Sequence, residues 1–182
     1  HYFLTDGVEL ARKLTDDLEN LIEDRSRLAF FIDNSLRIKK RIIEIDEFDT
    51  SIRHIFNYGH TFGHALEAIT NYKIPHGQAV TLGIDLANYI SLHLERISSD
   101  EFIMMHNILK KNIPTFSFNE KNIADYLEAL SKDKKNQGNK IGCILPKCPG
   151  EVEKVFIDNN EWLKNCIIMY SNSNVCKSKK VY

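Results

Sequence analysis

Three of the chain's seven histidines stand close together, at His60, His64 and His76. His60 and His64 are four residues apart, which places both on one face of a helix, one turn apart. Such a pair can hold a metal ion, or one member can bind the metal while the other meets a substrate. His76 follows Pro75 and opens a new helix, where the free N–H groups favour an anion and keep the imidazole neutral. Thr61 stands where zincin proteases have Glu, which argues against a zincin site.

Glycines flank the first two histidines. Gly59 and Gly63 precede His60 and His64 directly, and Gly83 lies further along the next predicted helix. Each glycine inside a helix costs about 1 kcal/mol relative to alanine. Placing two of them beside histidines indicates that another helix or a ligand must come close. A histidine pair at this spacing is often only a surface or core polar pair, so the residue pattern alone leaves both interpretations open.

Composition excludes several classes of protein. The 182 residues carry 24 Lys and Arg against 25 Asp and Glu, a net charge of −1. A general nucleic-acid binder would show a basic excess, so we expect no nucleic-acid partner. No apolar run reaches the roughly 20 residues that cross a bilayer, and no secretory signal opens the chain. The four cysteines are few and lie late in the chain, which favours free thiols and a cytoplasmic location.

Hydrophobic periodicity predicts a mainly α fold. We expect helices over residues 6–24, 26–45, 53–71, 76–94, 100–111, 120–130 and 160–170. Two short β-like stretches, 141–146 and 152–158, flank the turn signal "KCPGE" and predict a small hairpin. With no internal repeat or linker, the expectation is one helical domain over 1–170 and a polar tail over 171–182.

Two motifs carry a family resemblance. "R-x3-N-x-G-H-T-x-G-H-A-x-E" begins at Arg53, and "HG-x-AV-x-x-G" begins at His76. Together they resemble the signature of dehydroquinate synthases, within the sugar phosphate cyclases. The similarity extends upstream to "KKRIIEIDE" and downstream to "DKKNQGNKIGCILP", and so covers nearly the whole chain. It implies the multi-helix C-terminal domain of that family, with the N-terminal NAD-binding domain absent from this chain.

The resemblance also implies site residues. His60 and His76 would bind Zn²⁺ or Co²⁺, with a third ligand, a Glu, upstream of His1. Catalytic residues would be Lys39, Asp49 and His64; Asp49 stands where the family usually has Glu. Substrate contacts would come from Arg53, Asn57, His64, Lys134 and Lys135. An Arg fork suits a carboxylate and lysines suit phosphate. On the expected helix over 53–71, Asn57 and His64 would share one face.

The implied activity is that of an NAD- and metal-dependent carbon–oxygen lyase of the shikimate pathway, which makes aromatic amino acid precursors. The enzyme would convert 3-deoxy-D-arabino-heptulosonate 7-phosphate to 3-dehydroquinate with release of phosphate. The chain alone would be inactive, and the full-length protein would be a homodimer. Three alternatives stay open: another cyclase (a 2-deoxy-scyllo-inosose or valiolone-type synthase), an iron-type alcohol dehydrogenase-like domain, and a non-catalytic helical interaction module.

Overall fold

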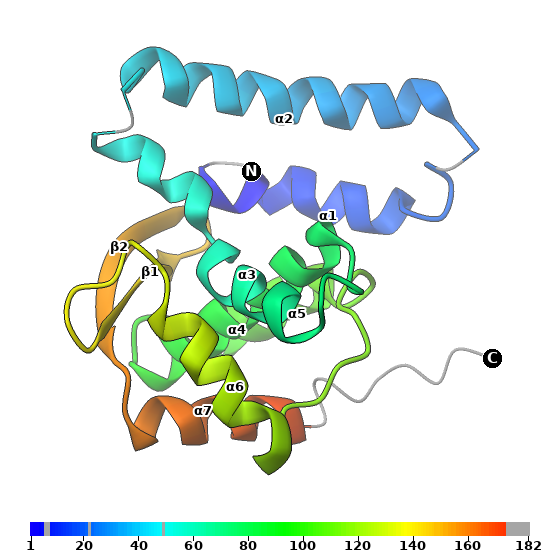
Figure 1. Ribbon diagram of the computed structural model, residues 1–182. Helices are drawn as coiled ribbons and strands as arrows, with labels where there is room; N and C mark the ends of the chain where they lie inside the picture. The colour runs from blue at the N-terminus through cyan, green and yellow to red at the C-terminus, as the bar shows by residue number, and fades with distance from the viewer. Residues whose placement is uncertain (6–7, 22, 49, 174–182) are drawn as a thin grey trace.

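The computed structural model describes residues 1–5, 8–21, 23–48 and 50–173 (Figure 1). Most of these residues are helical, and one antiparallel hairpin is the sheet, so the expected fold class is confirmed. In chain order the elements are η1 (Tyr2–Leu4), α1 (Val8–Asp17), α2 (Arg25–Ile45), η2 (Ile52–Asn57), α3 (His60–Ile69), α4 (His76–His93), α5 (Ser99–Leu109), α6 (Glu120–Ser131), β1 (Lys140–Cys148), β2 (Glu151–Asp158) and α7 (Glu161–Asn172).

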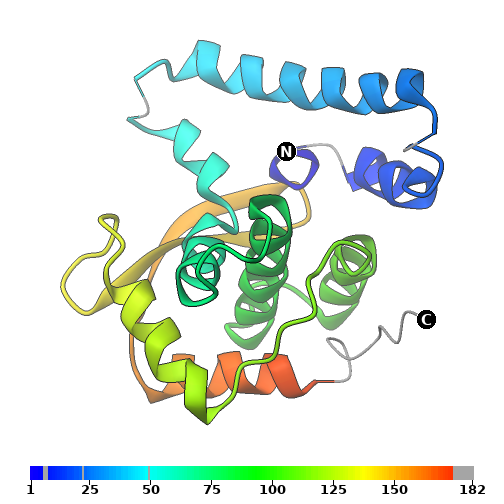
Figure 2. The same cartoon turned by 45° about the vertical axis from the view of Figure 1, so that its right-hand side comes forward.

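The central element is α4. In Figures 1 and 2, α2 runs along one edge of the molecule and α7 along the opposite edge, with α3 and α4 between them. Leu82, Leu86 and Ile90 are at most 2% exposed. A mostly apolar helix belongs in a core, as the sequence predicts for this segment. Within the described residues no helix combines the length and apolar character needed to span a bilayer.

Glycines allow α3 and α4 to touch through their backbones. A Cβ added at Gly83 would collide with the carbonyl oxygen of Gly59 and lie 2.8 Å from the amide nitrogen of Gly63. Gly59 also has a φ of +76°, in the left-handed region that favours glycine. The sequence expectation that another helix comes close is therefore confirmed, and α3 and α4 pack here backbone against backbone.

The expectation of one continuous helix over 53–71 is wrong. The segment is a 3₁₀ turn, η2, followed by a break at Gly59 and then by α3. The Asp46 carboxylate accepts the backbone N–H of Arg53 and favours the tight turn over an α-helix start. Asn57 therefore does not share a helix face with His64, and Gly59 caps α3 rather than lying inside it.

The first helix is also shorter than the expected 6–24, because α1 ends at Asp17. The N–H groups of Asn20 and Leu21 both donate to the Asp17 carbonyl oxygen, which closes a turn after the helix. Asp24 then caps α2 by accepting the N–H groups of the first helical turn. Capping chemistry thus overrides the apolar spacing that seemed to continue the helix.

The hairpin is attached to α3 and to the loop between α6 and β1. The Thr61 hydroxyl donates to the Gly142 carbonyl oxygen at 3.1 Å. The Asn136 side chain accepts the Gly142 N–H at 3.1 Å and donates to the Leu130 carbonyl oxygen at 2.8 Å. These bonds hold the loop between α6 and β1 and bring Lys135 beside η2.

Candidate metal and anion site

The structure brings the three histidines of the sequence motif together. Ring centroids lie 5.3 Å apart for His60 and His64, 5.4 Å for His60 and His76, and 5.8 Å for His64 and His76. His60 opens α3, His64 lies one turn later, and His76 opens α4. The backbone contact between the two helices therefore sets the spacing of the rings.

One hydrogen bond fixes the His60 ring. Its Nδ1 lies 3.1 Å from the Tyr58 carbonyl oxygen, which can only accept, so Nδ1 carries the proton. Nε2 then carries the lone pair that is available to a metal. Burial lowers the pKa of His60, and the charges of His64, His76 and Lys135 lower it further, although the bond to Tyr58 opposes the shift. A lowered pKa favours the neutral imidazole that binds metal.

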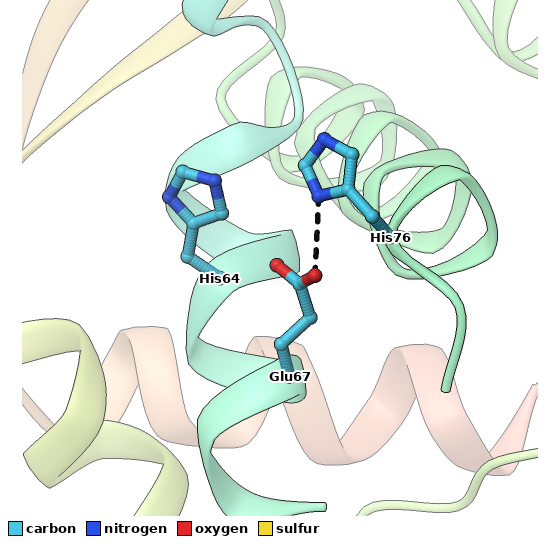
Figure 3. A group of neighbouring side chains, drawn as sticks. All are labelled: His64, Glu67 and His76. Atoms are coloured by element: carbon cyan, nitrogen blue, oxygen red, sulfur yellow. Dashed lines mark hydrogen bonds and ion pairs between the residues drawn. The ribbon is translucent and has the colours of Figure 1, made fainter. Parts of the chain in front are cut away.

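Figure 3 shows His76 pointing toward Glu67 of α3. His76 Nδ1 lies 3.1 Å from Glu67 Oε1, and Glu67 is buried beneath it. Potential ligand atoms of His64, Glu67 and His76 all lie within 4.8 Å of one another. This group includes His76 but not His60, so the structure offers a second possible ligand set beside the expected pair. Imidazole and carboxylate donors suit Zn²⁺ or Co²⁺ in either set.

A cavity lined in part by lysines lies between η2 and the hairpin. Its volume is about 190 Å³, and Asn57, Lys135, Lys154 and His54 are among the residues that line it. Lys135 Nζ donates to Asn57 Oδ1 at 3.2 Å and lies 3.5 Å from an Asp133 carboxylate oxygen. Two lysines at a small cavity give it the charge that a phosphate or carboxylate requires.

The remaining expected residues lie elsewhere. Lys39 is exposed on α2 and Lys134 is exposed in the loop before β1. Arg53 Nη1 donates to the Glu47 carbonyl oxygen at 2.7 Å. Asp49 lies outside the described residues. Within the described part of the chain, the three histidines form one group, and Asn57 and Lys135 form a second whose lysine charge acts on His60. Lys39 and Lys134 lie at the surface.

Sequence reasoning missed Asp46, which holds the turn carrying Arg53 and Asn57. Its carboxylate accepts the N–H groups of Arg53, Thr50 and Ser51. These bonds, that from Arg53 foremost, hold the pKa of Asp46 well below its usual range. The signal was present in the sequence, since an Asp followed closely by Thr and Ser after an apolar helix is typical of a side-chain-capped turn.

Comparison with known proteins identifies related sequences. Residues 1–136 match the family described as 3-dehydroquinate synthase C-terminal. The 3-dehydroquinate synthase of Campylobacter hominis is 38% identical over 148 residues, covering 80% of this chain and 43% of that protein. The enzyme of Alkaliphilus metalliredigens is 34% identical, covering 81% of this chain and 42% of the relative. This chain therefore spans less than half the length of these curated relatives.

Solved structures share the fold. A 2-epi-5-epi-valiolone synthase from Streptomyces hygroscopicus with NAD⁺ and Zn²⁺ bound has a TM-score of 0.74 at 16% identity, covering 94% of this chain and 48% of that one. A 2-deoxy-scyllo-inosose synthase complexed with carbaglucose-6-phosphate, NAD⁺ and Co²⁺ has a TM-score of 0.68 at 22% identity, covering 79% and 41%. At such identities the likeness establishes the architecture.

Proposed function

This chain belongs to the 3-dehydroquinate synthase C-terminal family, and we propose that it is the metal- and substrate-binding part of such an enzyme. The reaction would convert 3-deoxy-D-arabino-heptulosonate 7-phosphate to 3-dehydroquinate with release of phosphate. The observation that carries the proposal is the convergence of His60, His64 and His76. The cavity of Asn57 and Lys135 is close to them, because Thr61, the chain neighbour of His60, lines it and the charge of Lys135 acts on His60. A cation site next to an anion site matches a phosphorylated sugar acid.

The metal would be Zn²⁺ or Co²⁺, held by His60 and His76. Both rings have a protein acceptor at Nδ1, so both present Nε2 as the free donor. Two protein ligands make a weak site, and a carboxylate from the rest of the enzyme would complete it. A divalent cation supplies Lewis acidity toward hydroxyl and carbonyl oxygens of the substrate.

The protein's own side chains would orient the substrate. Lys135 and Asn57 are already joined by a hydrogen bond and would receive the phosphate together, with His64 within reach from α3. Arg53 would pair with the substrate carboxylate, and Lys39 of α2 would add a second cation. NAD would be bound mainly by the part of the enzyme that this chain does not cover, and the whole enzyme would be a homodimer.

Sequence identity favours the acid substrate over those of other cyclases. Curated 3-dehydroquinate synthases are 31–38% identical to this chain, whereas the solved inosose and valiolone synthases are 16–22% identical. Arg53 and Asn57 are also both present, and a carboxylate substrate gives the guanidinium a partner of matching shape.

A fusion protein tests the proposal. This chain replaces the matching segment of the Campylobacter hominis enzyme, which supplies the remaining part, and phosphate release is measured with NAD⁺ and Zn²⁺ present. We expect release from the heptulosonate phosphate without net NADH formation, and little release from a sugar phosphate that lacks a carboxylate. The unfused chain should release none.

Two outcomes would refute this function. Net NADH accumulation would instead identify a dehydrogenase. A fusion that folds and binds NAD⁺ but releases no phosphate, with His60→Ala and His76→Ala holding as much zinc as the parent, would leave only an interaction module. The matched control is the Campylobacter hominis enzyme itself under the same conditions.

A further inference from the structure

Glu67 is a buried carboxylate with an unusual set of partners. Its side chain is 10% exposed, and among the described residues its side-chain partner is the imidazole of His76, with no Lys or Arg within salt-bridge distance there. A carboxylate taken out of water is destabilising unless a cation or several donors compensate it. One hydrogen bond from a half-exposed imidazole is weak compensation, so a contribution to folding does not account for the residue.

We propose that Glu67 is a positioning residue that holds His76 in the tautomer and orientation required to bind the metal. The inference rests on the proposed metal site. Glu67 would bond to the metal ligand His76 and would not coordinate the ion itself. His76 Nδ1 lies 3.1 Å from Glu67 Oε1, so the shared proton sits on Nδ1 and Nε2 keeps its lone pair. The carboxylate also makes the ring a stronger donor.

The two helices explain why such a device is required. His60 is oriented by the carbonyl of Tyr58, a residue anchored beside it in the chain. His76 opens α4 directly after Pro75, and among the described residues its ring bonds to the Glu67 carboxylate and to no backbone carbonyl. Its side chain is 58% exposed and would otherwise rotate freely in solvent. Glu67 reaches across from α3, two helical turns after His60, and ties the second imidazole to the helix that carries the first.

A direct ligand role for Glu67 makes a different prediction. If Glu67 binds the ion itself, replacing its carboxylate with an amide removes the charged ligand atom, and affinity falls as far as in His76→Ala. If Glu67 acts through His76, a glutamine still accepts the Nδ1 proton through its carbonyl oxygen, and only methionine breaks the bond. Glu67→Gln and Glu67→Met therefore separate the two roles.

The experiment measures Zn²⁺ affinity of the 182-residue chain by competition with a chromophoric chelator. Variants are Glu67→Gln, Glu67→Met, His60→Ala and His76→Ala, with Glu128→Gln as the matched control on an exposed face of α6. The tautomer of His76 is read in the metal-free chain from ¹⁵N chemical shifts, and unfolding by urea gives the stability of each metal-free variant.

We expect Glu67→Met to weaken Zn²⁺ binding by about 10- to 100-fold, the usual effect of losing such an outer partner. Glu67→Gln should lose clearly less, and Glu128→Gln nothing. The Nδ1–H tautomer of His76 should dominate in the parent chain and mix with the other in Glu67→Met. The metal-free Glu67→Met chain should be at least as stable as the parent, because it no longer buries a carboxylate.

Several results would overturn the inference. If Glu67→Met keeps its Zn²⁺ affinity while His60→Ala and His76→Ala lose zinc, the positioning role is refuted and the metal site is supported. Loss in Glu67→Gln equal to that in His76→Ala makes Glu67 a ligand. Full affinity in both histidine variants refutes the proposed metal site itself, and the tautomer measurement then shows independently whether Glu67 orients the ring.

Discussion

Adding one methyl group at Gly83 tests whether the contact between α3 and α4 sets the histidine spacing. The new Cβ would overlap the Gly59 carbonyl oxygen and approach the Gly63 nitrogen to 2.8 Å. Both obstacles are backbone atoms, which cannot rotate away as a side chain would. Gly83→Ala therefore requires the two helices to separate, and His60 and His76 move apart with them.

The size of the effect follows from two opposing terms. Alanine gains about 1 kcal/mol over glycine in a helix interior. Overpacking a core typically costs about 1–3 kcal/mol, and rigid backbone neighbours place this site at the upper end. The net loss of unfolding free energy is then about 2 kcal/mol, which lowers Tm by roughly 4–8 °C in a domain of this size.

Gly77→Ala is the matched control, because it lies in the same helix and its added Cβ meets nothing within 4 Å. It should keep the helix-propensity gain and raise the unfolding free energy by up to about 1 kcal/mol. Urea unfolding of the metal-free chains measures both changes, and chelator competition measures Zn²⁺ affinity. The reasoning would be refuted if the Gly83→Ala chain were as stable as the Gly77→Ala chain and bound zinc with unaltered affinity.

Three further predictions concern charge and burial. Asp46→Asn should destabilise the chain at pH 7, because the depressed pKa of Asp46 contributes stability above its unfolded pKa of about 4. That stability is lost as the pH falls through the folded value, so urea unfolding should show the difference from the parent shrinking below about pH 4. In the fusion enzyme, Lys135→Met should raise KM for the phosphorylated substrate about 10- to 100-fold through loss of a charge-assisted bond. Lys134→Met, at an exposed position, should leave KM nearly unchanged. Burial raises the pKa of Cys143 to about 12, so iodoacetamide at pH 8 should spare it and alkylate the partly exposed Cys148, as mass spectrometry of tryptic peptides would show.

Hydrophobic periodicity was sufficient to predict the elements whose apolar residues pack in the core. The predicted helix over 76–94 matches α4 to within a residue, because most of that segment is buried, including a continuous run from Asp85 to Ser91. The hairpin was predicted from its turn signal. Helix ends were less predictable, since hydrogen bonds from single polar side chains decide them. Asp24 begins α2 and Asp46 favours η2 over α-helix, and neither appears in a hydrophobic pattern.

In the site, too, the sequence pattern predicted some features, and contacts in the folded chain decide the others. The motif spacing was sufficient to select His60, His64 and His76, but it placed Asn57 on the wrong element, because one left-handed glycine turns the chain between Asn57 and His60. Before that turn Asn57 contacts Lys135 of the distant loop, and after it His60 and His64 lie on α3 close to His76 of α4. A continuous helix would have put the amide and the histidines on one face. In the proposed function, the break would place the phosphate contacts of Asn57 and Lys135 on one side and the metal-binding imidazoles on the other, and a substrate carrying a phosphate and a metal-binding oxygen would need both.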